Sequence, residues 1–123
     1  MIQNYRGEIK ETLKSIQCDI PFHVKMAFPE SINEGNIISY FELTNTSTSL
    51  SVVDDISFQI DLWFFDLDEL FTMLSLVDKA LTDKGLLRQF VSPDSMLHDS
   101  SGYLRKTLRY GRRVDTLTNR LID

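Results

Sequence analysis

The stretch from Ser57 to Gly85 constrains the fold of this 123-residue chain more than any other part. In its first eight residues, one of two alternating faces is apolar: Phe58, Ile60, Leu62 and Phe64. This period of two predicts a strand with one buried face. From Asp66 onward the period becomes helical; Asp66 and Glu69 have the spacing of a capping box, and Gly85 is a stop signal. The stretch therefore predicts a strand that passes directly into an amphipathic helix.

The helix expected over residues 67–84 is the main donor to the core. Six of its apolar residues share one face of a helical wheel: Leu67, Leu70, Phe71, Leu74, Val77 and Leu81. Their burial is worth on the order of 10 kcal/mol gross. Met73, Leu76 and Ala80 widen the apolar sector, which indicates either a broader core stripe or a contact with a neighbouring subunit.

The N-terminal part predicts a second helix and two strands. A narrow apolar stripe at helical spacing is formed by Ile2, Tyr5, Ile9, Leu13 and Ile16. Pro21 ends this helix, and residues 22–28 then alternate as a first strand with His23 on its polar side. Residues 36–44 predict a second strand.

The polar residues 44–55 (TNTSTSLSVVDD) predict a loop that is longer than most connections in compact domains. They indicate a flexible hairpin tip, further edge pairing through residues 50–53, or a projecting arm used in assembly.

The C-terminal third predicts two more strands. Residues 86–91 return after the helix and complete a strand, helix and strand crossover. Residues 103–112 alternate again, with Tyr103, Arg105 and Arg109 on one face and Arg112 and Arg113 just beyond. Residues 114–123 lack clear periodicity and are expected as a terminal arm. The predicted fold is thus a single α+β domain over residues 1–123, with one mixed, mostly antiparallel sheet and two helices on one face.

The net charge of −5 is unevenly distributed along the chain. Residues 1–100 hold 7 Lys and Arg against 16 Asp and Glu, a net charge of −9, whereas residues 101–123 hold 6 against 2, a net charge of +4. Such a distribution suits nucleic acid, or the contact of one copy's basic end with another copy's acidic body. The acidic total favours the second interpretation.

The sequence contains no catalytic, phosphate-binding or zinc-binding motif. Cys18 is the only cysteine and is expected to be buried as a small apolar residue. Enzymatic use of Asp61 or His98 would need partners that the sequence does not identify. We therefore expect no enzyme, no cofactor, no metal site and no small-molecule substrate. With neither an apolar span nor a signal peptide, no membrane contact and a cytoplasmic location are expected.

The polar face of the strand over residues 57–64 is the better candidate for function. Gln59, Asp61 and Trp63 share it, so it must be open to water or covered by something polar. Trp63 is either an interface residue or a tryptophan covered by a loop. Candidate interface residues are Gln59, Asp61, Trp63, Arg105, Arg109, Arg112 and Arg113.

The order of these segments resembles the small tail-completion, or tail-terminator, proteins of long-tailed phages and prophages. The matching segments, which follow an N-terminal helix and cover most of the chain, are PFHVKMAFP, GNIISYFELTN, SFQIDLWFFDLDELFTMLSLVDKALTDKG and DSMLHDSSGYLRKTLRYGRR. The segment after Arg113 departs from the usual abrupt end of this family.

The resemblance implies an α+β protein that forms a homo-oligomeric, hexameric ring and joins the tail to the head. Its partners would be the tail tube protein and the head connector proteins. It would lie at the head-proximal end of the tail in the virion, and in the host bacterial cytoplasm during assembly.

The alternative function is a small nucleic-acid-binding or regulatory module. It would use Tyr103, Arg105, Arg109, Arg112 and Arg113 as a basic and aromatic surface. The acidic body of the chain weighs against it, because it would repel a phosphate backbone.

Overall fold

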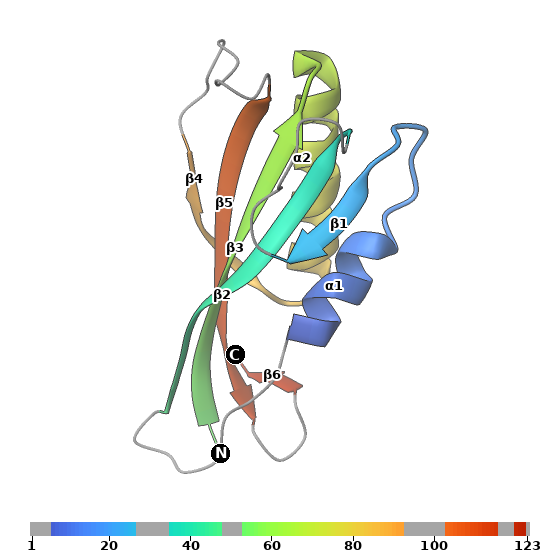
Figure 1. Cartoon of the computed structure of the whole chain (residues 1–123). Helices are drawn as coiled ribbons and strands as arrows, with labels where there is room; N and C mark the ends of the chain where they lie inside the picture. Colours follow the sequence, from blue (N-terminus) through green and yellow to red (C-terminus); the bar gives the residue numbers. More distant parts are fainter. Residues whose placement is uncertain (1–5, 27–34, 48–52, 93–102, 116–119, 123) are drawn as a thin grey trace.

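The computed structural model describes residues 6–26, 35–47, 53–92, 103–115 and 120–122. These residues form two helices and six strands (Figure 1). In chain order they are α1 (Arg6–Lys14), β1 (His23–Met26), β2 (Ile37–Ser47), β3 (Val53–Phe64), α2 (Leu67–Asp83), β4 (Leu87–Val91), β5 (Leu104–Asp115) and β6 (Arg120–Ile122). The fold class is α+β, as predicted.

The strands form one mixed sheet in the order β1-β2-β3-β5-β4, and β6 pairs with the end of β5. The β1 and β2 strands are parallel, whereas the other hydrogen-bonded pairs among the described strands are antiparallel. Figure 1 shows both helices on the same side of the sheet. We call the opposite face the helix-free face, since no described helix covers it.

The main core lies between the sheet and the two helices. Alternation along β3 directs four residues toward the helices, and each has 0% exposed surface: Phe58, Ile60, Leu62 and Phe64. The helices contribute Ile9, Leu13, Leu70, Met73, Val77 and Leu81. Each such side chain contributes roughly 1.5–3 kcal/mol by leaving water, so this layer supplies most of the burial in the fold.

Helix α2 has the predicted ends, but its buried face differs from the prediction. Asp66 is the N-cap, and its side chain accepts a hydrogen bond from the backbone N–H of Glu69 at 3.0 Å. Gly85 has a φ of 93°, the left-handed conformation expected after a helix. The placement of Phe71 in the core is wrong, because its exposed fraction is 36% while Met73 is fully buried. A helical wheel shows how wide the apolar sector is, but not which part of it packs against the sheet. The part that contains Met73 does so.

The prediction of a polar loop over residues 44–55 is wrong for most of its length. Strand β2 continues to Ser47 and β3 begins at Val53, with Thr44 opposite Ser57 and Ser47 opposite Asp54. Strand pairing uses main-chain groups, so polar side chains do not prevent it. The other edge of β3 is also paired here, because Val53 lies opposite Asp115 on β5. Residues 48–52 lie outside the described part.

The C-terminal residues correct the expectation of a terminal arm. Strand β5 extends to Asp115, and β6 returns antiparallel to it, with Arg113 opposite Ile122. Since β3 occupies the other edge of β5, β6 takes the edge that β4 leaves beyond Gly111. Residues 114–115 and 120–122 are therefore part of the sheet.

The predicted strand, helix and strand unit is present as β3, α2 and β4. Strands β3 and β4 are both antiparallel to β5, so they are parallel to each other, and β5 lies between them. The position of β5 between them places its arginines beside β3.

Two further expectations can be compared with the described residues. The prediction that Cys18 is buried is wrong; it is exposed, because it follows α1 in the connection to β1. No helix in the described ranges is long and apolar enough to cross a membrane.

Candidate protein interface on the helix-free face

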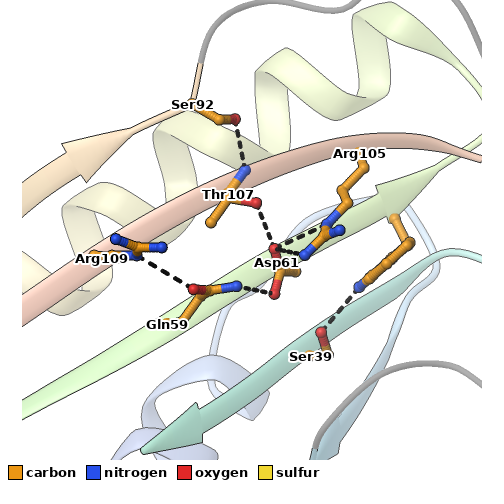
Figure 2. Close-up of polar contacts among 8 residues, drawn as sticks. Ser39, Gln59, Asp61, Ser92, Arg105, Thr107 and Arg109 are labelled. Atoms are coloured by element: carbon orange, nitrogen blue, oxygen red, sulfur yellow. Dashed lines mark hydrogen bonds and ion pairs between the residues drawn. The ribbon is translucent and has the colours of Figure 1, made fainter. Parts of the chain in front are cut away.

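Polar side chains from three neighbouring strands meet on the helix-free face (Figure 2). The register places Asp61 of β3 between Ser39 of β2 and Thr107 of β5. Because side chains alternate along a strand, residues two positions away share this face. We call the resulting set the polar cluster: Ser39, Gln59, Asp61, Trp63, Arg105, Thr107 and Arg109.

Asp61 is the centre of the polar cluster. It has 0% exposed surface, and its Oδ1 accepts hydrogen bonds from the Thr107 hydroxyl at 2.5 Å and from Arg105 Nε at 3.2 Å. Its Oδ2 accepts a hydrogen bond from the side-chain amide of Gln59 at 3.0 Å. The ion pair with Arg105 also has Nη2 at 3.2 Å from Oδ1. A buried carboxylate is costly unless it is paired in this way.

Gln59 relays this network to a second arginine. Its carbonyl oxygen accepts a hydrogen bond from Arg109 Nε at 3.2 Å, while its amide nitrogen donates to Asp61. The guanidinium of Arg109 also lies 5.0 Å from the centre of the Phe90 ring. A cation over an aromatic ring is stabilised by the ring's electrons, so Arg109 is held from two sides.

Ser92, just after β4, closes the other side of the cluster. Its hydroxyl accepts the backbone N–H of Thr107 at 2.9 Å, and its own N–H donates to the Thr107 carbonyl at 2.8 Å. These bonds fix the backbone of β5 where the Thr107 side chain reaches Asp61.

Trp63 joins the polar cluster to a small second core that it forms with Ile37 and Tyr103. Its exposed fraction is 7%, and its indole N–H donates to the Ser39 hydroxyl at 2.9 Å. The guanidinium of Arg105 lies 4.6 Å from the centre of its ring, and Tyr103 packs edge-on with ring centres 6.1 Å apart. The Tyr103 hydroxyl donates to the Gly35 carbonyl at 2.7 Å. Trp63 is therefore held within its own chain.

The cluster presents positive charge at the surface. Asp61 and Gln59 are buried, whereas the Arg105 side chain is 40% exposed and Arg109 is also exposed. This face was expected to be either open to water or covered by something polar. The second alternative is confirmed, because polar groups of the same chain cover Asp61 and Gln59. A partner on this face would contact the two arginines above the buried residues.

The structure brings together five of the seven predicted interface residues: Gln59, Asp61, Trp63, Arg105 and Arg109. Arg112 does not join them. It lies opposite Ile56, a residue of the helix-side core, so strand alternation places it on the other face. The backbone of Arg113 lies in β5, but its side chain is outside the described part.

Sequence reasoning missed three contributors to this face: Ser39, Phe90 and Ser92. Alternation placed Thr107 on the face of Arg105 and Arg109, but Thr107 was not named as a candidate interface residue. The three missed residues join through strand pairing, for which local sequence carries no signal.

The described residues contain no group of three or more His, Cys, Asp or Glu side chains that could hold a metal ion. The hydrogen-bond partners of Asp61 in this cluster are all donors. His98, the other residue considered for catalysis, lies outside the described ranges. The exposed charged groups of the polar cluster are the guanidinium groups of Arg105 and Arg109, which suit recognition of negative charge.

Comparison of the chain with protein-family models and with curated protein sequences finds no match.

Proposed function

We propose that this protein is a structural assembly protein of a phage or prophage tail, of the tail-completion type. Its copies would form a ring, in which each copy contacts the next through two different surfaces, and the ring would lie between the tail tube and the phage head. The observation that carries the proposal is the pair Arg105 and Arg109, held on the helix-free face of a chain with a net charge of −5. Arginines fixed in position lose little side-chain entropy when they bind a partner.

The same chain offers a complementary surface at the start of α2. Asp68 and Glu69 lie in its first turn and Asp66 is its N-cap, and Phe65 and Phe71 beside them are 41% and 36% exposed. The basic surface has an exposed aromatic residue of its own, Phe90. Since the two surfaces differ, contact between them is heterologous, and heterologous contacts form rings when the rotation closes.

Light scattering at several protein concentrations, with and without the tail tube protein of the same genome, tests the proposal. Arg109→Glu should weaken association about tenfold, and Asp68→Lys should restore part of it when the two are combined. Lys84→Glu, which makes the same charge change at an exposed residue at the other end of α2, is the matched control. A strict monomer that binds no tail tube protein would count decisively against the proposal.

The nucleic-acid alternative has less support from the described residues. Tyr103, the aromatic residue of the surface expected for that function, is 1% exposed, and Arg112 belongs to the other face. If the alternative holds, binding to single-stranded DNA should weaken steeply between low and moderate salt, because neutralised phosphates release counterions. Absence of salt-dependent binding would eliminate it.

A further inference from the structure

Strand β4 forms an edge of the sheet and is unusually exposed for a strand with apolar residues. All five of its residues are exposed, and the exposed fractions of Leu87, Phe90 and Val91 are 57%, 41% and 37%. No described strand pairs with its outer edge. Such an edge is a template for an added strand unless charged side chains, prolines or β-bulges block it. The register of β4 shifts between Arg88 and Phe90, after which Phe90 and Val91 pair in succession with Arg109 and Leu108.

The charged residue of β4 is turned away from this edge. Arg88 Nη1 lies 3.0 Å from Asp78 Oδ2 on α2, and the same carboxylate accepts the Tyr110 hydroxyl at 2.6 Å. Burial and this hydrogen bond raise the pKa of Tyr110 far above its usual range, so the hydroxyl keeps its proton. Arg88 is thus directed toward α2.

A pocket of about 130 Å³ lies beside β4 on the helix side. It is lined by Leu74, Ser75, Asp78, Arg88, Val91 and Leu108. Since an apolar cavity of about 150 Å³ can hold benzene, this pocket is large enough for one branched aliphatic side chain. On the opposite face of the same strand, Arg109 lies over Phe90.

We propose that the free edge of β4 binds an extended segment of another protein as an added strand, with an aliphatic side chain in the pocket and a neighbouring acidic side chain beside Arg109. Successive residues of a strand point to opposite faces, so an alternating aliphatic and acidic sequence places each kind on the correct side. Charge complementarity selects the acidic partner. Arg109 is exposed beside Phe90 and its printed hydrogen bond goes to the neutral Gln59, whereas the charges of Arg88 and Asp78 on the helix side offset each other.

The test uses a fluorescently labelled, end-capped peptide, Thr-Val-Glu-Leu-Glu-Val-Thr, titrated with the full-length protein and followed by anisotropy. We expect it to bind at least about tenfold more tightly than the same peptide with lysine for glutamate. A third peptide, N-methylated at alternate amides on the edge that faces β4, should also lose about tenfold, because it keeps the side chains but not the strand hydrogen bonds. Equal binding of all three peptides, or no binding, would overturn the proposal.

Two variants of Ser75 locate the binding site. Ser75 is exposed on α2 and lines the pocket, so Ser75→Phe should fill the pocket and weaken the glutamate peptide about tenfold, while Ser75→Ala stays within about twofold. Peptide binding that Ser75→Phe leaves unchanged overturns the proposal. The proposal is also overturned if the protein binds no peptide but self-associates, and if Leu87→Glu abolishes this self-association. In that case a second copy of the chain occupies the edge. Failure here leaves the assembly proposal intact, since that contact joins Arg109 to the start of α2 and needs neither strand pairing at β4 nor the pocket.

Discussion

Leu62 and Asp61 are adjacent residues of β3, and both have 0% exposed surface, yet they are enclosed by different means. Leu62 faces the helices and is enclosed by apolar side chains, whereas Asp61 faces away from them and is enclosed by Gln59, Thr107 and Arg105. Apolar packing depends on volume and tolerates graded change. A buried polar network depends on each donor having an acceptor, so the loss of one member affects all of its partners.

The largest effect is expected on the helix side. Phe58→Ala should lower the free energy of unfolding by about 3–5 kcal/mol, because Phe58 has 0% exposed surface and its removal leaves a cavity. Urea unfolding followed by circular dichroism measures this change. Phe71→Ala, at a 36% exposed position of α2, is the control and should cost clearly less. Equal losses for the two variants would contradict the placement of the core.

On the helix-free face, Asp61→Ala should cost about 3 kcal/mol, because it leaves three donors without their common acceptor. Thr107→Ala removes one donor and should cost about 1 kcal/mol. In a double-mutant cycle, Asp61→Ala and Arg105→Ala should couple by about 1–2 kcal/mol, a modest value because Arg105 is 40% exposed. Strict additivity would show that the polar cluster does not act as a unit.

The helix side also contains a hydrogen bond between Tyr110 and Asp78. Its contribution to stability depends on pH, whereas that of the surrounding apolar side chains does not. Burial and the hydrogen bond to Asp78 raise the pKa of Tyr110 above that of the unfolded chain. The resulting stabilisation is complete below about pH 10 and is lost as pH rises further, because the unfolded chain then releases a proton that the folded chain keeps. Above pH 10, the wild type should lose about 1.4 kcal/mol per pH unit more than Tyr110→Phe. Parallel unfolding curves for the two proteins between pH 9 and 11 would refute this.

The smallest effect concerns the start of the helix that covers one face. Asp66→Ala should cost about 1 kcal/mol, because it removes the acceptor for the Glu69 N–H. Asp66→Asn keeps a capping oxygen and should cost much less in unfolding measurements, but it removes a charge from the proposed contact surface. We expect both variants to weaken association equally, and only Asp66→Ala to lower stability. That result would show that the cap stabilises the helix while the charge of Asp66 contributes to binding.

The two faces also differ in how far the sequence predicted them. Alternation in β3 correctly identified Phe58, Ile60, Leu62 and Phe64 as one buried face. It also placed Gln59, Asp61 and Trp63 on the other face, but it did not predict that they are buried within the monomer. Their cover comes from Arg105 and Thr107, more than 40 residues away in the chain, and such pairings leave no local periodicity.

The misplaced residues follow the same division. The polar residues 44–47 and 54–55 were predicted as loop, because side-chain character was used where main-chain pairing determines the structure. Arg112 was grouped with Arg109, although three positions along a strand lead to the opposite face. Phe71 was assigned to the core, because a wheel does not show which line of the apolar sector contacts the sheet; the burial of Met73 agrees with the broader core stripe that was one of the two interpretations.

The sequence by itself determined the strand and helix of residues 57–85, because strand alternation, the Asp66 cap and the Gly85 stop act between residues close in the chain. Only the tertiary structure decided that β5 lies between β3 and β4. That insertion brings Arg105, Thr107 and Arg109 over Asp61 and Gln59, and it leaves β4 at the edge. The physical reason is that register between distant strands is set by main-chain hydrogen bonds and by the burial of whole faces, which local sequence does not encode.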